Sequence, residues 1–502
     1  MQASEELQIH LAEVKALGGA AAVLGWDQQT YMPPGGAGAR AAQLSALSRV
    51  IHQQETGDTT ARLLERAEQE GEHLDVDSDD AAYLRMARRD FDQATKLPEA
   101  LVAELASVTT LAHEELAAAR KDNDYARFAP WLAKILGLTR SVADHLEYSE
   151  CRYDALLDQY EPGMKTSQVR EMFDTLKPEL VNLVQRIVSK GPDAVDSSIL
   201  TRSYDEAKQE AFGRKIVTAI GFDWTRGRSD RALHPFCTSF TSGDVRITTR
   251  FDTHFLPMAL FGSMHETGHA LYEQGVSPRY DGNVLGDGAS LGVHESQSRL
   301  WENLIGRARP FWSRYYPELK AAFPESLGDA GSEDFYRAIN KVSPSLIRVE
   351  ADEVTYNLHI LLRFEMELAL LEEKISVADA PEAWNAKMVE YFGLTPPDNA
   401  QGILQDVHWS GGSIGYFPTY TVGNILSVQL FEQANADLGG QTSAQIAAGE
   451  FMPLLGWLRE NVHQWGRKYL PTELVQRVTG GPLDTAPYLR YLKTKFGEIY
   501  GL

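Results

Sequence analysis

Apolar residues recur at intervals of three and four over much of the chain, which is the spacing of amphipathic helices. This pattern predicts long helices over residues 5–24, 38–54, 78–94, 98–121, 128–157 and 167–188. Helix start signals such as Leu97-Pro98-Glu99 and stop signals such as Glu161-Pro162-Gly163 accompany it. The first part of the chain is therefore expected to be helical.

The pattern changes near the middle of the sequence. Residues 236–240 and 245–251 alternate between the two faces of a strand and are rich in Thr, Phe, Val and Ile, with Ser242-Gly243-Asp244 between them. This arrangement predicts a β-hairpin. Helical spacing returns at Pro257 and continues to the C-terminus, interrupted by glycine-rich loops at 275–288 and 408–415. Loops of that length inside a compact domain usually carry function.

The sequence contains no linker, internal repeat or low-complexity tract that would divide it. We therefore expect one large, mostly α-helical domain over residues 1–502 with a small β-sheet. Within it we distinguish an N-terminal helical part at about 1–230, a part at about 231–430 that holds the chemical motifs, and C-terminal helices at about 431–502.

Composition narrows the possible functions. Lys and Arg number 48 against 70 Asp and Glu, and the resulting net charge of -22 repels phosphate backbones and anionic membranes. We expect neither a nucleic-acid nor a membrane partner. The N-terminus lacks the basic start of a signal peptide, and the apolar run at 17–26 is too short to span a bilayer. Two distant cysteines, Cys151 and Cys237, fit a reducing compartment, so a cytoplasmic location is expected.

The sequence HExxH occurs at residues 265–269, in a stretch with helical spacing. Residues four apart lie on one helix face, so the imidazoles of His265 and His269 can bind a single zinc-type ion. Glu266 lies about 100° around the helix, where its carboxylate can accept a proton from a water that the ion activates. This combination is typical of metallopeptidases.

A catalytic zinc site needs a third protein ligand and one open position. Glu273 is a poor candidate, because its Cα is about 12 Å along the helix from that of His265. The next predicted helix, 289–305, offers Glu295 and Glu302, which are about 10 Å apart along the axis. At most one of them binds the ion, and the spacing leaves open which. The other is then a solvated or outer carboxylate.

A set of motifs stands in order along the chain: HPF at 234–236, DxRxT at 244–248, HExxH at 265–269, HES at 294–296, IRxxAD at 347–352 and GxxQDxHW at 402–409. With these motifs the sequence resembles the carboxypeptidase Taq family of metallopeptidases over essentially its whole length. The stretch 24–34 is also similar to the family, with Gln29 where Glu is expected most often.

The resemblance implies several properties that spacing does not show. It implies Glu295 as the third metal ligand. It implies one divalent ion per chain, with Zn²⁺ as the first choice and Co²⁺ as the alternative. It also implies a homodimer. It also implies a mostly helical fold with a deep substrate groove, narrowed by the HPF motif that contains His234 and lined by the DxRxT strand, with the small sheet next to the HExxH helix. The implied activity is the removal of single residues, with broad specificity, from peptides with a free C-terminal carboxylate.

A carboxypeptidase must bind that carboxylate, and an arginine in a partly buried pocket does so well. Arg348 and Arg246 are the candidates, and Arg348 is preferred. The reaction also needs a donor for the developing oxyanion. His408, with Asp406 possible as its orienting partner, and Tyr420 are candidates for this role. For each residue the alternative is structural: a surface ion pair for an arginine, or loop packing for the others.

Two rival functions stand beside this one. An oligopeptidase or endopeptidase uses the same metal chemistry and differs only in whether the groove is closed at one end. A non-catalytic helical binding protein is the second rival. However, a structural metal site fills its fourth position with a protein ligand and has no use for a base at Glu266.

Overall fold

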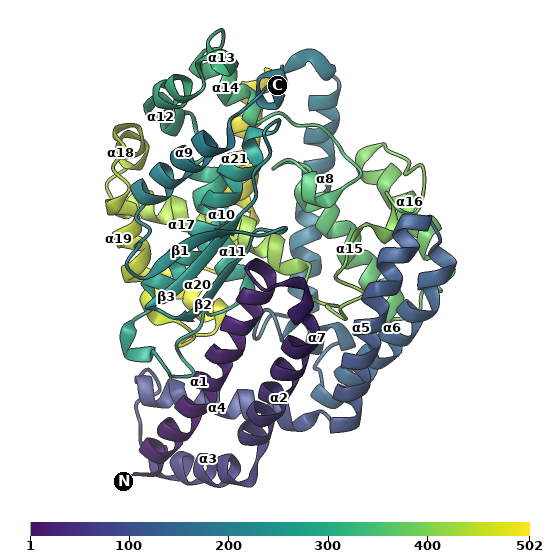
Figure 1. The fold of residues 1–502 in the computed structure, drawn as a ribbon, viewed down its shortest axis with the longest axis vertical. Coiled ribbons are helices and arrows are strands. Elements are labelled where there is room, and N and C mark those ends of the chain that lie inside the picture. The colour runs from purple at the N-terminus through teal and green to yellow at the C-terminus, as the bar shows by residue number, and fades with distance from the viewer. Residues whose placement is uncertain (1) are drawn as a thin grey trace. The chain divides into compact units, whose positions relative to one another are not determined.

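The structure is a computed structural model that describes residues 2–502 (Figure 1). The chain forms two compact units, each assembled from three separate stretches. The first unit contains the chain up to Thr95, Ser197–Ile339 and Leu426–Leu483, and the second contains Lys96–Asp196, Asn340–Ile425 and Asp484–Leu502. The predicted fold class, mostly α-helical with one small sheet, is confirmed. The sequential division near residues 230 and 430 stays a prediction.

Helices make up most of the first unit. They are α1 (Ala3–Thr30), α2 (Ala37–Thr56), α3 (Asp58–Gly71), α4 (Asp79–Lys96), α9 (Glu206–Ala219), α10 (Leu256–Gly275), α11 (Leu291–Arg299), α12 (Arg309–Ala322), α13 (Pro324–Leu327), α14 (Ser332–Ile339), α18 (Thr442–Ala448), α19 (Met452–Asn461) and α20 (Pro471–Thr479). Helix α17 (Pro418–Asp437) begins in the second unit and ends in the first. Helix α3 lies outside the predicted helices, because its apolar positions are few among charged residues.

The sheet has three strands in the order β1-β3-β2, namely β1 (Gly227–Arg231), β3 (Asp244–Thr249) and β2 (Cys237–Thr241). Strands β2 and β3 are antiparallel, and Thr241 pairs with Asp244, so the predicted hairpin is confirmed. Strand β1 was not predicted and pairs with β3 in parallel. Helix α10 packs on β2 and β3, with α11 on its other side (Figure 1). The sheet therefore supports the HExxH helix, as expected.

The predicted helix at 289–305 forms, but not as one regular helix. Helix α11 continues directly into a π-helical segment at Leu300–Ile305. A π-turn rotates the residues that follow it relative to a continuous α-helix, and such turns occur frequently at functional sites. Glu302 lies inside this π-helical segment, whereas Glu295 lies in the regular helix before it.

The first glycine-rich loop is anchored to a separate hydrophobic cluster. Val276, Tyr280 and Leu285 are buried together with residues of α1, α3 and α4. These anchors hold the loop that returns the chain from α10 to α11. The two helices can therefore lie side by side, with their polar residues facing one another.

The second unit is also helical. Its helices are α5 (Glu99–Asp122), α6 (Tyr125–Leu146), α7 (Arg152–Leu157), α8 (Thr166–Val188), α15 (Tyr356–Leu371), α16 (Ala380–Phe392) and α21 (Thr485–Tyr500). Helix α15 is buried on nearly all of its faces, which is typical of a central core helix. The prediction of one helix over 128–157 is wrong at its centre, because the chain turns at Glu147, where φ is +66°.

Helix α1 is long and apolar. It has 28 residues, and by length and composition alone it is apolar enough to cross a membrane. The apolar run at 17–26, from which no membrane span is expected, is part of this helix. In this structure α1 packs against α2, α3 and β2, and Lys15 forms an ion pair with Asp287 at 2.5 Å. Both cysteines are free thiols, as expected.

Candidate metal centre and active site

Helices α10 and α11 approach each other closely, and Gly268 of the HExxH motif makes this possible. A Cβ at this position would lie 2.5 Å from the carbonyl oxygen of Gln297 and 2.5 Å from the Cα of Ser298. Both are backbone atoms of α11, so any larger residue would push the helices apart. The glycine therefore sets how near α11 comes to the two histidines of α10.

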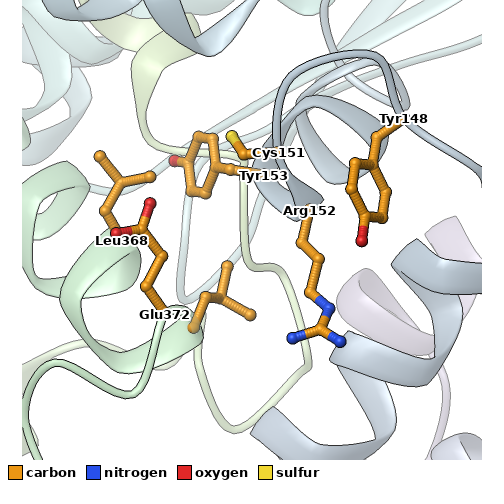
Figure 2. Close-up of a pocket in the computed structure, with 7 residues that line it drawn as sticks. Tyr148, Cys151, Arg152, Tyr153, Leu368 and Glu372 are labelled. Carbon is orange, nitrogen blue, oxygen red and sulfur yellow. The ribbon is translucent and has the colours of Figure 1, made fainter.

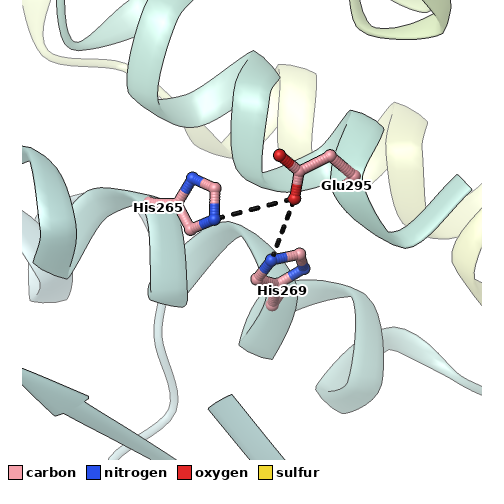
Figure 3. A group of neighbouring side chains, drawn as sticks. All are labelled: His265, His269 and Glu295. Atoms are coloured by element: carbon pink, nitrogen blue, oxygen red, sulfur yellow. Dashed lines mark ion pairs between the residues drawn. The ribbon is translucent and has the colours of Figure 1, made fainter. Parts of the chain in front are cut away.

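The close approach brings three potential metal ligands together. Glu295 Oε2 lies 3.7 Å from His265 Nε2 and 3.4 Å from His269 Nε2 (Figure 3). These ligand atoms all lie within 4.8 Å of one another. Two ligands at zinc distances in a tetrahedron are about 3.3 Å apart, so this donor set fits a divalent ion of that size. The side chains of His265 and His269 are 20% and 16% exposed, which leaves a route for water.

The second oxygen of Glu295 has a different partner. Arg299 donates from Nε to Glu295 Oε1 at 2.6 Å, which leaves Oε2 directed at the imidazoles. Ser298 also donates to Oε2 at 3.1 Å. Arg299 reaches Glu302 as well, at 3.3 Å. One arginine thus bridges the two glutamates between which the spacing could not choose.

Glu302 contacts the opposite nitrogen of His265. Its Oε2 lies 2.9 Å from His265 Nδ1. With the proton on Nδ1 donated to Glu302, Nε2 keeps its lone pair for a metal ion. Carboxylates in this position orient ligating histidines and raise their basicity. This contact favours the position of an outer carboxylate for Glu302, which is one of the two alternatives that the sequence leaves open.

His269 is oriented through a second histidine. His269 Nδ1 lies 2.6 Å from His294 Nδ1, and His294 Nε2 lies 2.7 Å from Glu273 Oε1. A consistent proton arrangement exists: His269 donates to His294, and His294 donates to Glu273. This arrangement again leaves His269 Nε2 free to bind an ion. Glu273, which is too far away to be a ligand, has an orienting role in this geometry.

The ionisable groups of the site have pKa values shifted in different directions. Burial raises the pKa of Glu302, but the hydrogen bond with His265 and the charge of Arg299 outweigh it and lower this pKa to about 2. Burial lowers the pKa of His265, but Glu295 and Glu302 outweigh it and raise it to about 9. Burial lowers the pKa of His269 to about 3. An ion that binds here therefore displaces a proton from His265.

Glu266 lies on the same helix, one residue from His265, and is buried. Burial raises its pKa to about 7, and Glu295 and Glu302 add to the effect. Burial raises the pKa of the Cys237 thiol, and the negative charge of Glu266 adds to this effect. A carboxyl group with this pKa exchanges protons readily at neutral pH.

Two further predicted residues belong to the first unit. Arg246 on β3 forms an ion pair with Asp244 at 2.7 Å, and its guanidinium lies 4.3 Å from the ring centroid of Trp26 and 4.8 Å from that of Phe240. His234 is exposed in the loop between β1 and β2. The DxRxT motif thus forms a strand, as expected.

Arg348, in the second unit, is already paired with a carboxylate. Its Nη2 donates to Asp406 at 2.8 Å, and its Nη1 donates to the hydroxyl of Tyr356 at 3.2 Å. Arg363 of α15 donates to the same aspartate. Gln405 joins the cluster, because its side-chain oxygen accepts from the backbone N–H of Arg348 at 3.0 Å and from Arg363 at 2.9 Å. Two buried arginines therefore share one aspartate as their acceptor.

The proposed oxyanion donors lie next to each other in the same unit. The hydroxyl of Tyr420 is 3.4 Å from His408 Nε2. His408 Nδ1 lies 3.3 Å from Asp406, in an alignment too poor for a hydrogen bond. Burial lowers the pKa of His408, and the neighbouring Asp406 opposes part of this effect. The aromatic ring of Phe417 packs on it, with a centroid distance of 4.5 Å.

The sequence matches a known protein family over nearly its whole length. The family model described as carboxypeptidase Taq (M32) metallopeptidase matches residues 6–496. The chain belongs to this family. Thermostable carboxypeptidase 1 of Thermus thermophilus is 44% identical to it over 506 residues, covering 99% of this chain and 98% of that protein. Carboxypeptidase 1 of Bacillus subtilis is 37% identical, covering 96% of this chain and 95% of that protein.

The fold agrees with that of a solved member of the family. The crystal structure of the M32 carboxypeptidase from Deinococcus radiodurans matches with a TM-score of 0.97 and 41% identity over 100% of both chains. This M32 chain is a metallocarboxypeptidase, and therefore a peptide hydrolase. Membership in a metallopeptidase family implies a divalent metal, and the cluster of His265, His269 and Glu295 offers a place for it.

Three residues that contact the predicted residues within their own unit were not assigned from the sequence. His294 lies within HES, but only its neighbour Glu295 was given a role. Arg299 follows Glu295 by one helical turn, a spacing that indicates an ion pair on one helix face. Arg363 gave no signal of its own, because it lies in an apolar helix far from any motif.

Proposed function

We propose that this metallocarboxypeptidase releases single amino acids from peptide C-termini with broad specificity, and that Glu266 is its general base. The observation that carries the proposal is the placement of three ligand atoms from His265, His269 and Glu295 around one point, with Glu266 on the same helix. We propose one divalent ion per chain, Zn²⁺ first and Co²⁺ as the alternative. Such an ion supplies a Lewis acid for the peptide carbonyl and for the attacking water.

The protein's own groups then handle the proton. Because burial raises the pKa of Glu266 to about 7, this carboxylate can take a proton from the attacking water at neutral pH. In its protonated form it can pass that proton to the nitrogen of the departing amino acid. His265 and His269 do not exchange protons in these steps, since their Nδ1 atoms are already hydrogen-bonded to Glu302 and His294.

We propose that the terminal carboxylate of the substrate is bound by Arg348, with Arg246 as the alternative and with His234 contributing to the substrate groove. Arg348 is 6% exposed, so an ion pair formed with its guanidinium is only weakly screened by water. Asp406 already offsets part of its charge, which keeps the arginine buried in the absence of a peptide. His408 and Tyr420 are the proposed oxyanion donors, and their contact of 3.4 Å supports a joint role.

The remaining proposals concern the setting of the enzyme. We propose a homodimer in the cytoplasm, without a nucleic-acid or membrane partner. The net charge of -22 supports the absence of both anionic partners. The ion pair of Lys15 with Asp287 and the packing of α1 on α3 support a role for α1 within the fold, although its composition alone would allow a membrane span.

A single pair of peptides tests the proposal against an endopeptidase. The free-acid peptide should shorten one residue at a time, and its C-terminally amidated twin should be nearly inert. A charged hydrogen bond lost in a buried site costs roughly 2–5 kcal/mol, which is a factor of about thirty to several thousand in rate. An endopeptidase would cut both peptides at similar rates and release internal fragments, while a non-catalytic protein would cut neither.

The same two peptides distinguish the roles of Arg348 and Arg246. Arg348→Ala should slow hydrolysis of the free acid far more than hydrolysis of the amide, so the difference between the two peptides shrinks. Arg246→Ala is the matched variant and should leave the difference near its wild-type size. If Arg246→Ala shrinks the difference and Arg348→Ala does not, the assignment of the carboxylate-binding arginine is wrong.

A further inference from the structure

Glu367 of α15 is a completely buried carboxylate to which three donors are directed. Its Oε1 accepts from Trp409 Nε1 at 2.9 Å. Its Oε2 accepts from the hydroxyl of Tyr153 at 2.7 Å and from the backbone N–H of Gly415 at 3.1 Å. Placing a carboxylate in such a buried position is costly unless its oxygens are hydrogen-bonded, and here all three contacts supply hydrogen bonds.

Two of these donors mark the ends of one loop. Trp409 and Gly415 flank the second glycine-rich stretch, so a single carboxylate joins the beginning and the end of that loop to α15. Gly415 has a φ of +94°, and a Cβ there would lie 2.9 Å from the carbonyl carbon of Leu156. The glycine thus lets its N–H reach Glu367 while the backbone passes closely over α7.

The third donor comes from α7. The side chain of Tyr153 extends from this helix toward α15, beside a cavity of about 270 Å³ that Cys151 and Arg152 also line (Figure 2). The ring of Tyr153 is buried and packs edge-on against Phe364, with a centroid distance of 5.4 Å. Its hydroxyl is therefore fixed, and it closes the remaining side of the carboxylate.

We propose that Glu367 is a positioning residue that closes the loop 409–415 and thereby fixes His408, the residue before Trp409. This inference rests on the proposed role of His408 as an oxyanion donor. The loop leaves little freedom at its first end, because Trp409 is 4% exposed and packs against Trp384. His408 in turn contacts Phe417 and Tyr420 just after the loop ends. Movement of the loop would therefore change the geometry of the His408–Tyr420 pair.

The donors explain why a carboxylate is required. The indole of Trp409 and the amide of Gly415 can only donate, and they address different oxygens of Glu367. A glutamine has one oxygen and one NH₂ group, so in either orientation its NH₂ group faces one of these donors. Glu367→Gln therefore releases one end of the loop, although it preserves the size of the side chain.

Removal of one donor should restore the fit. In Glu367→Gln combined with Trp409→Phe, the glutamine oxygen can accept from Gly415 and Tyr153 while its NH₂ group points to the place of the lost indole N–H. The matched control is Glu367→Gln combined with Tyr153→Phe. It leaves both donor-only partners in place, so it should bring no recovery.

Two readouts measure these variants on the full-length, metal-loaded enzyme. Hydrogen exchange of the amides in 409–415 reports on loop closure, and kcat with KM for a free-acid peptide reports on His408. We expect Glu367→Gln to raise exchange and lower kcat by roughly tenfold or more each, with metal content unchanged. The Trp409→Phe double variant should recover wild-type exchange at the Gly415 end and part of kcat, because it removes the conflict between donors but cannot restore the hydrogen bond at residue 409. The Tyr153→Phe double variant should recover neither.

The outcomes separate this inference from the proposed function. The closing role of Glu367 is overturned if the loop amides of Glu367→Gln exchange at the wild-type rate. It is also overturned if exchange and kcat recover equally in both double variants. Raised exchange with wild-type kcat supports the closing role but overturns the role of His408. If Glu367→Gln does not fold, Trp409→Phe alone must raise exchange near residue 409 and spare Gly415. Equal exchange at both ends would then overturn the inference.

Discussion

Replacement of Glu302 by glutamine tests how the metal centre is oriented. Glu302 Oε2 accepts from His265 Nδ1 at 2.9 Å and from Arg299 at 3.3 Å, while Oε1 accepts from Arg307 at 3.3 Å. Glutamine has a single acceptor oxygen, so either His265 or Arg307 then faces an amide N–H. In one case the Nδ1 proton of His265 loses its acceptor. In the other the partly exposed Arg307 loses its contact with Glu302 and keeps its hydrogen bond to the carbonyl oxygen of Ile339.

The size of the effect follows from these contacts. Loss of an outer partner of a ligating histidine lowers metal affinity roughly 10- to 100-fold. This corresponds to about 1.4–2.7 kcal/mol of binding free energy. Glu295→Gln should lower the affinity further, because one of the three protein ligands is weakened and Arg299 loses its closest acceptor, Oε1 at 2.6 Å.

The assay is a competition between the metal-free enzyme and a chromophoric chelator at constant pH. Affinity should decrease from the wild type to Glu302→Gln and then to Glu295→Gln. Glu318→Gln changes a glutamate that pairs with Arg314 outside the site, and it should bind as the wild type does. A wild-type affinity in Glu302→Gln would refute the orienting role. A metal-free Glu302 variant beside a metal-loaded Glu295 variant would reverse the ligand assignment.

Three further predictions concern α10. Glu266→Gln should keep metal affinity near the wild-type value and lower kcat/KM by a factor of about 10² to 10⁴, because an amide cannot accept the proton of water; near-normal activity at full metal content would contradict this. The metal-free enzyme should lose thermal stability as the pH rises from about 6.5 through about 9. The pKa of His265 is raised in the folded state, so its charged form stabilises the fold below that range. Calorimetry of His265→Gln should show a flatter dependence of the melting temperature on pH. Gly268→Ala should cost about 1–3 kcal/mol in unfolding free energy and also weaken metal binding, because its methyl group would meet the backbone of α11; a denaturant midpoint equal to that of the wild type would argue against this packing.

Local pattern was sufficient for much of the fold. The helices α1, α2, α4, α5, α8 and α10 and the β2–β3 hairpin follow from apolar spacing and turn residues, because these features act over a few neighbouring positions. Strand β1 was missed, since its parallel pairing with β3 depends on residues distant in sequence. The break between α6 and α7 was missed because it lies at Glu147, a residue type that gives no turn signal although its φ is +66°.

The metal centre was also predictable only in part from the sequence. The sequence by itself determined that His265 and His269 share one face of a helix and that Glu266 lies beside them, because helical geometry is periodic. It also limited the third ligand to two glutamates. Only the tertiary structure decided that Glu295 faces both Nε2 atoms and that Glu302 takes the Nδ1 atom of His265. That choice depends on how closely α11 approaches α10 and on the π-helical segment that contains Glu302. Both features are set by packing between helices and not by the spacing of residues along either helix.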